Sequence, residues 1–281
     1  MADISRLLEE REFESGEEMN PFLDSMLASG APPASKSRTP LEEAQDLMYQ
    51  AWGATGRQRV RLARQALEFS PDCADAYVLL AEETARSLEE ARDLYQKGVE
   101  AGERALGPET FEEDVGYFWG LLETRPYMRA RLGLAQCLWA LGERQAAIEH
   151  YRDMLRLNPS DNQGVRDLLA TSLLEEGMDK ELGELLTRYD DAMAGWAYTR
   201  ALWLFRRHGP SPQADAGLRE GFQRNRFVPL YLLGRKRLPR RLPQYIGFGD
   251  ENEAISYAAA NLAAWRRTPG ALEWLADLKS Q

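Results

Sequence analysis

The chain has 281 residues, 44% of them hydrophobic, and a formal net charge of −10 at pH 7. This length allows one large domain or two modest ones, and the acidic balance repels polyphosphates at long range, which makes nucleic acid an unlikely partner. Two cysteines and two scattered histidines cannot form a zinc site of Cys/His type, and no apolar run reaches the ~20 residues of a membrane span.

Residues 1–40 are predicted to form an acidic flexible tail and linker. Residues 1–29 hold eight acids against two arginines, and "GAPPASKSRTP" (30–40) has the composition of a flexible linker. The tail is interpreted either as a disordered, solubilising segment or as a short motif that folds onto a groove. A further hypothesis is that it folds back onto a basic patch near the other end of the chain.

From residue 41 onward, amphipathic helical patterns alternate with short polar turns. At a fixed offset of 88 residues, "RVRLARQALEFSPD" aligns with "AAIEHYRDMLRLNPSD", so that Leu67 matches Leu155 and Pro71 matches Pro159. Each copy is an apolar-striped helix, a proline that stops it, a polar turn and a second helix. The repeat predicts a chain built from helix pairs.

One unit, "ARLGLAQCLWALGERQAAIEHYRDMLRLNP", resembles a tetratricopeptide repeat, which is a helix-turn-helix unit of about 34 residues. The positions that match the motif are Leu134, Ala135, Leu138, Gly142, Ala147, Tyr151 and Pro159. The predicted fold class is therefore all-α, a right-handed α-solenoid of antiparallel helix pairs over residues 41–278. An insertion is predicted at about 102–124, and a C-terminal helix pair at 251–278.

A narrower resemblance covers roughly residues 70–278. The segments "DCADAYVLLAEETARSLEEARDLYQKGVEAGERAL", "NRFVPLYLLGRKRLP" and "ENEAISYAAANLAAWRRTPGALEWL" are similar, in this order, to the suppression-of-tumorigenicity-7 family. Its animal members carry membrane-spanning segments upstream, whereas no such segment is expected in this chain. The resemblance implies the fold rather than a biochemical activity.

Stacked helix pairs bury their apolar stripes and leave a curved groove that the first helix of each pair lines. The sequence predicts that two adjacent first helices present the partner-binding residues, namely Arg129, Leu132, Gln136 and Trp139 on one, and Asp75, Val78, Glu82 and Arg86 on the preceding one. Trp139 is interpreted either as a groove contact or as ordinary packing. The Lys/Asn pattern that clamps a terminal carboxylate in some tetratricopeptide domains is absent from these positions.

A basic patch lies in "GRKRLPRRLPQYIGFGDENEA" (234–254), and it consists of Arg235, Lys236, Arg237, Arg240 and Arg241. Three interpretations stay open: a solvated or internally paired surface, a docking patch for an acidic protein segment, and a site for nucleic acid or anionic lipid. The aromatic residues nearby are interpreted as packing groups, and these are Phe227, Tyr231, Tyr245 and Phe248. Asp250 and Glu253 are predicted to form a capping box.

The sequence contains no Gly-rich loop ending in Gly-Lys-Ser/Thr, no His-Glu-x-x-His and no Gly-x-Ser-x-Gly. Paired acids such as Asp190 and Asp191 are interpreted as solvated. We therefore expect a cytoplasmic, non-catalytic scaffold that needs no cofactor or metal and binds a peptide or partner protein in its groove. An acidic protein segment is the candidate partner of the basic patch. The alternatives are a regulatory or substrate-recruiting subunit of an enzyme complex and a nucleic-acid-associated adaptor that uses the basic patch.

Overall fold

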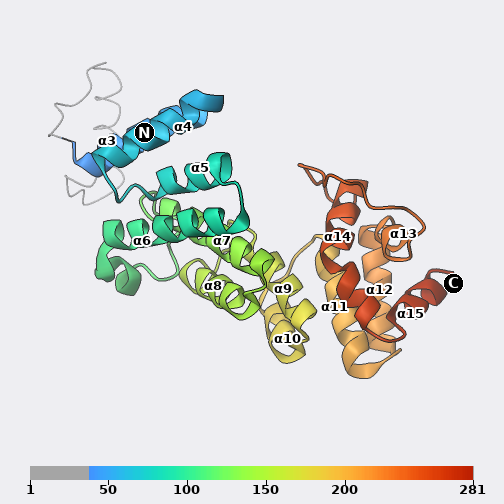
Figure 1. Cartoon of the computed structure of the whole chain (residues 1–281). Coiled ribbons are helices and arrows are strands. Elements are labelled where there is room, and N and C mark those ends of the chain that lie inside the picture. Colours follow the sequence, from blue (N-terminus) through green and yellow to red (C-terminus); the bar gives the residue numbers. More distant parts are fainter. Residues whose placement is uncertain (1–37, 281) are drawn as a thin grey trace, which may run out of the picture.

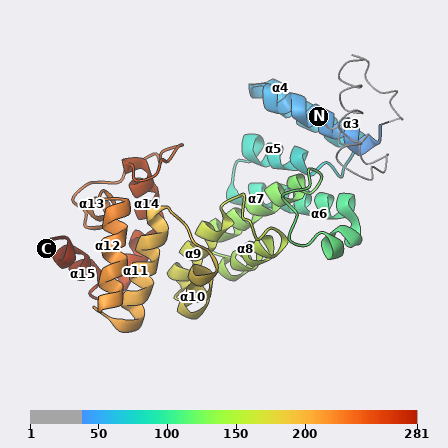
Figure 2. The same cartoon turned by 180° about the vertical axis from the view of Figure 1, so that it is seen from behind.

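The structure is a computed structural model that describes residues 38–280, and within this range every regular element is a helix. Figure 1 and Figure 2 show the helices following one another as a succession of pairs from α3 and α4 to α14 and α15. The prediction of an all-α solenoid of helix pairs is confirmed. The predicted acidic tail lies outside the described residues as far as residue 37.

The helices are α3 (Pro40–Gly53), α4 (Gly56–Phe69), α5 (Ala74–Thr84), α6 (Leu88–Glu113), α7 (Arg125–Leu141), α8 (Arg144–Leu157), α9 (Val165–Glu176), α10 (Asp179–Arg188), α11 (Ala194–His208), α12 (Pro212–Arg224), α13 (Val228–Leu232), α14 (Glu251–Arg267) and α15 (Ala271–Ser280).

Local capping chemistry fixes where several helices begin and end. Thr39 begins α3 with a complete capping box, because its hydroxyl accepts from Glu42 N at 3.2 Å while the Glu42 carboxylate accepts from Thr39 N at 2.7 Å. Gly142 and Gly177 end α7 and α9 in the left-handed conformation, with φ of 87° and 70°. These shared ends place α7 and α9 in equivalent positions of successive pairs.

The segment assigned to an insertion begins inside α6 and breaks that helix. Gly107 has φ 73° and ψ 164°, and Pro108 follows it, so α6 kinks at this point. The irregular chain beyond α6 is fixed from both sides: Gly116 N and Phe118 N donate to Leu157 O, and the buried Phe118 ring packs near Tyr127. The segment therefore fills the core beside α7 and α8.

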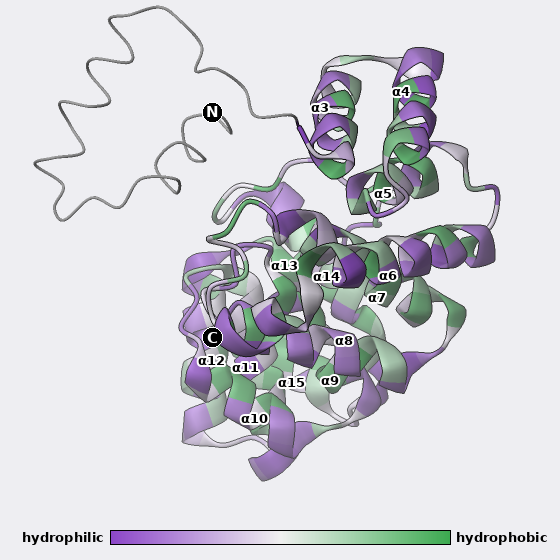
Figure 3. Ribbon diagram, turned by 90° about the vertical axis from the view of Figure 1, so that its left-hand side faces the viewer, coloured by the Kyte–Doolittle hydropathy of each residue, from purple (hydrophilic) through white to green (hydrophobic). Residues whose placement is uncertain are grey.

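The hydrophobic core consists of two clusters. The smaller one joins α3, α4 and the inner side of α5, with Met48 and Leu79 among its buried residues. The larger one runs from α5 to α15 and contains Trp196 and Trp265. Figure 3 shows apolar residues concentrated where helices face one another and polar residues on the outer turns. The first helix pair thus packs on α5 through a cluster that is separate from the larger one, and polar contacts add to its connection with α7.

The C-terminal pair packs back onto earlier first helices, because α14 contacts α9, α11 and α13. Asp250 caps α14 as predicted, accepting from Glu253 N at 2.7 Å. The second half of the predicted capping box is wrong: the Glu253 carboxylate, 3% exposed, accepts from Ala194 N, Asn225 Nδ2 and Gly249 N at 2.7–2.8 Å. This carboxylate joins the start of α11 to the start of α14, where the helix dipole favours negative charge.

None of the helices between residues 38 and 280 combines the length and the apolar character that crossing a membrane would require.

Candidate functional site

A buried carboxylate connects three consecutive first helices, α3, α5 and α7. Asp75 on α5 is 1% exposed, and it accepts from Arg129 Nε at 2.8 Å and Arg129 Nη2 at 2.7 Å, both on α7. Gln45 Nε2 on α3 donates to the same carboxylate at 2.9 Å. We call this set, Gln45, Asp75 and Arg129, the Asp75 junction. Its geometry is that of a bidentate guanidinium–carboxylate pair, the strongest common form of an ion pair.

An exposed aromatic pair lies next to this junction. The Arg129 guanidinium carbon is 5.1 Å from the centre of the Trp52 ring, and Trp52 packs edge to face on Tyr49 at 5.5 Å. Trp52 is 40% exposed and Tyr49 is also exposed. Cation–π contact and aromatic packing therefore hold the rings in place while they remain open to solvent. We call the exposed side chains of α3, α5, α7 and α9 the first-helix face.

The residues predicted to bind a partner divide into two groups. Asp75 and Val78 are buried, so they support the face from beneath. Glu82 and Gln136 are exposed, whereas Arg129, Leu132 and Trp139 are half-buried. The Arg144 guanidinium carbon lies 3.9 Å from the centre of the Trp139 ring. Trp139 therefore packs against Arg144 and is also partly accessible to a partner. Desolvation is the main cause that raises the pKa of Glu82 above its ordinary value.

Sequence reasoning missed the aromatic pair of α3 and one acid of α9. Tyr49 and Trp52 are three residues apart, a spacing that puts them on one side of a helix and that was available as a signal. Asp167 lies on α9 at the position equivalent to Leu132 of α7, judged from the shared helix ends. Desolvation, reinforced by the charge of Asp191, raises the pKa of Asp167 to about 6, although part of its side chain is exposed.

A second polar junction lies at the start of α9. Asp161 caps this helix by accepting from Val165 N at 2.7 Å and Arg166 N at 3.0 Å. The Arg166 guanidinium then reaches Asp191, with Nε at 3.0 Å and Nη2 at 2.5 Å. The interpretation of Asp191 as a solvated acid is wrong, because it is buried and its carboxylate also accepts from Met193 N. Asp190, beside it, is exposed.

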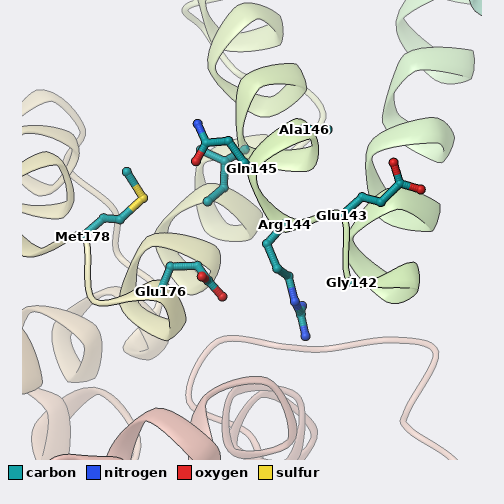
Figure 4. A pocket seen from close by; sticks show the side chains of 8 residues that line it. Gly142, Glu143, Arg144, Gln145, Ala146, Glu176 and Met178 are labelled. Atoms are coloured by element: carbon teal, nitrogen blue, oxygen red, sulfur yellow. The ribbon is translucent and has the colours of Figure 1, made fainter.

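The hollows on the surface are open to solvent and are lined by both polar and apolar groups. Figure 4 shows one of about 440 Å³ between the turns that end α7 and α9, where Arg144 lies between Glu143 and Glu176. Another, of about 770 Å³, lies where α10 meets α11 around Trp203. Over residues 38–280 the structure brings together no three His, Cys, Asp or Glu side chains able to hold a metal ion.

The basic patch is largely unpaired within the part of the chain that the structure describes. Lys236 Nζ lies 2.5 Å from Glu251 Oε1, whereas the four arginines are exposed and form no ion pair with any described residue. Among the aromatic residues interpreted as packing groups, Tyr231 is buried and Phe227 half-buried. The interpretation is wrong for Tyr245 and Phe248, which are 83% and 76% exposed.

Successive helix pairs, glycine-ended first helices and a face of exposed side chains define a helical-repeat protein of the tetratricopeptide-like class. The model of the family described as ST7 protein matches residues 36–278, so the chain belongs to the ST7 family.

Its relatives include two vertebrate proteins named suppressor of tumorigenicity 7 protein-like, each 31% identical over 84% of this chain. The one from Bos taurus is covered over 46% of its length and the one from Homo sapiens over 45%. The Drosophila melanogaster protein ST7 homolog is 28% identical over 83% of this chain and 48% of its own length. The chain therefore spans about half the length of these relatives.

Among solved structures, the chain is similar to YrrB, described as a TPR protein with an unusual peptide-binding site. The TM-score is 0.45 at 17% sequence identity, and the match covers 66% of this chain and 84% of the YrrB chain.

Proposed function

We propose that this protein is a non-catalytic scaffold that binds a peptide or a partner protein along its first-helix face. The observation that carries the proposal is the exposed aromatic pair, Tyr49 and Trp52, held against the guanidinium of Arg129 above a buried carboxylate. Trp, Tyr and Arg are the residues that dominate binding energy at protein interfaces. A surface whose rings are already fixed by packing loses little side-chain entropy when a partner covers it.

The polar groups of this face suit a polypeptide ligand. Arg129 uses Nε and Nη2 on Asp75, and its Nη1 makes no hydrogen bond with any described residue, so it is available to a carbonyl or carboxylate of the partner. Gln136 offers a donor and an acceptor on the same helix and is exposed. Glu82 and Asp167 add negative charge, which favours a partner with basic residues opposite them.

The two cysteines support a reducing compartment for this function. Cys73 and Cys137 are both free and buried, and burial raises the pKa of both thiols, that of Cys73 to about 12. Buried reduced thiols of this kind are typical of cytosolic proteins. We therefore place the binding reaction in the cytoplasm.

The test begins with peptides selected on the whole chain from a random display library, whose affinities are then measured by fluorescence anisotropy. We expect W52A and Q136E each to weaken the selected peptides about tenfold or more, as loss of an interface anchor does. The matched control is F69A, because Phe69 is an exposed aromatic residue on α4, outside the first-helix face. F69A should change affinity by less than about twofold. Peptides that bind W52A and Q136E as tightly as the unmodified chain would exclude this face.

A further inference from the structure

The connection between α13 and α14 carries two kinds of side chain, adjacent in sequence, that find no partner among the residues that the structure describes. We call residues 235–248 the basic–apolar loop. Its arginines are exposed and form no ion pair within residues 38–280: Arg235, Arg237, Arg240 and Arg241. The large apolar side chains that follow are all at least half exposed, and these are Leu242, Tyr245, Ile246 and Phe248.

Both ends of this loop are fixed to the helical body. At its start, Lys236 N donates to Leu230 O at 2.9 Å and Leu238 packs against the core. At its end, Gly247 N donates to Asp250 Oδ2 at 2.8 Å. Between these anchors, residues 239–246 make no hydrogen bond with the rest of the described chain. Figure 1 and Figure 2 show the connection projecting from the helices beside α14.

The loop projects from the helical body, and its apolar side chains remain exposed in the structure (Figure 1). Soluble surfaces rarely gather several large exposed apolar side chains, and such a group marks a contact with another molecule or a membrane. The neighbouring arginines indicate that the contacted surface is negatively charged. Whatever covers the loop must therefore offer anionic groups and an apolar layer within the same few ångströms.

We propose that the basic–apolar loop docks this protein on an anionic lipid surface. Guanidinium groups pair with lipid phosphates and carboxylates, and basic clusters are attracted to acidic leaflets. Aromatic side chains such as Tyr and Phe are favoured at the level of the lipid headgroups, and Leu and Ile insert at the boundary with the acyl chains. An acidic polypeptide would satisfy the arginines but leave the apolar tip in water. A single-stranded nucleic acid would stack on Tyr245 and Phe248 without covering Leu242 or Ile246.

This inference is independent of the first-helix face, and it predicts a peripheral contact of modest strength. The chain as a whole carries a net charge of −10, which opposes the approach to an acidic membrane. Binding should therefore need both the arginines and the apolar side chains of the loop. It should weaken as the salt concentration rises, because salt screens the attraction between the arginines and the anionic lipids.

The experiment is flotation of the whole chain with vesicles of phosphatidylcholine, alone or in a three-to-one mixture with phosphatidylserine. The unmodified chain should float with the mixed vesicles and remain unbound with phosphatidylcholine alone. The triple variant R237Q/R240Q/R241Q should lower the partition coefficient by about a hundredfold. The triple variant Y245S/I246S/F248S should lower it by about tenfold or more.

A matched control removes the same charge elsewhere. The triple variant R57Q/R61Q/R64Q changes three exposed arginines of α4 that form no ion pair with any described residue. It should change the partition coefficient by less than about threefold. All these positions are exposed, so far-UV circular dichroism should show equal helix content in every variant.

Three results would overturn the proposal. One is failure of the unmodified chain to float with the mixed vesicles at low salt. This holds even if a chain lacking residues 1–37 floats, because the loop would then bind the acidic N-terminal segment of its own chain. Another is undiminished vesicle binding by Y245S/I246S/F248S, which would show that the apolar side chains of the loop do not enter the lipid. The third is an equal loss in the α4 control, which would reduce the effect to net charge.

Discussion

Breaking the Asp75 junction should detach the first helix pair from the rest of the solenoid. In the variant R129M the aliphatic stem remains, while both charged hydrogen bonds to Asp75, at 2.8 and 2.7 Å, are lost. Asp75 is 1% exposed in the unmodified protein, and in the variant Gln45 Nε2 is its remaining side-chain donor. A buried carboxylate that loses its cation is destabilising, because no other charge replaces the guanidinium.

The size of the effect follows from the exposure of the two partners. Removing one member of a fully buried pair costs about 3–5 kcal/mol. The Arg129 side chain is 32% exposed, so water reaches part of the site that it vacates. Together with the Gln45 hydrogen bond this reduces the expected loss to about 2–3 kcal/mol of unfolding free energy. D75N should cost less, about 1 kcal/mol, because the freed guanidinium can turn to solvent.

Urea unfolding followed by circular dichroism measures these losses, and a double-mutant cycle isolates the pair. The double variant D75N/R129M should be more stable than R129M alone, since it no longer contains an unpaired buried charge. Hydrogen exchange should show the amides of α3 and α4 losing protection before those of α7 and α8, because their apolar cluster is a separate one. Additive single effects, or a loss below about 0.5 kcal/mol in R129M, would refute this account.

Three further predictions concern single side chains. D167N should raise the free energy of unfolding at pH 7.5 by about 1 kcal/mol, a value reduced to allow for the exposure of the side chain. The pKa of Asp167 is raised to about 6 in the folded protein, whereas it is ~4 in the unfolded chain. The folded protein therefore loses stability as the pH rises from ~4 through about 6 and Asp167 ionises. The gain, measured by urea unfolding, should shrink at pH 4.5, and a gain unchanged by pH would contradict it. G133A should lower stability by about 1–3 kcal/mol, because the added Cβ would lie 2.2 Å from the Tyr95 ring. The control is G53A, whose added Cβ would meet no atom within 4 Å, and it should leave the melting temperature unchanged or raise it. E253A should cost about 2–3 kcal/mol, because the carboxylate accepts from Ala194 N, Asn225 Nδ2 and Gly249 N, and Ala194 N is buried with no other acceptor within the described residues. An unchanged melting temperature would show that water replaces the carboxylate.

The helix pairs were predictable because their signals are local. The proline that follows α4 and the glycine that ends α7 act on their own turn of chain, and apolar spacing shows which side of each helix is buried. Contacts between distant segments have no such signal. Arg129 and Asp75 were both assigned to first helices facing a groove, but nothing in their spacing of 54 residues shows that they bind each other. The same limit applies to Glu253, whose spacing from Asp250 fits a local capping box although its partners include Ala194.

The exposed residues of the basic–apolar loop were mispredicted for a related reason. An aromatic residue in a repeat helix can be placed by the repeat motif, as Tyr151 was, and Tyr151 is buried. Tyr245 and Phe248 lie in a loop with two prolines and two glycines nearby, where no period applies, so aromatic character alone was taken as a sign of packing. Their exposure is visible only in the structure, where none of the described helices covers them.

The arginines of this chain separate its structural surfaces from its candidate binding surfaces. Arg129, Arg166 and Arg206 each join one helix pair to another through an acid or a carbonyl, and each is at least partly shielded from solvent. In a chain with more acids than bases, carboxylates are available to pair with nearly every guanidinium. Arg240 and Arg241 are exposed, form no ion pair with residues 38–280 and follow one another beside exposed apolar side chains, so they contribute nothing to the packing of the described helices. Their place in the molecule is therefore best explained by a surface outside it.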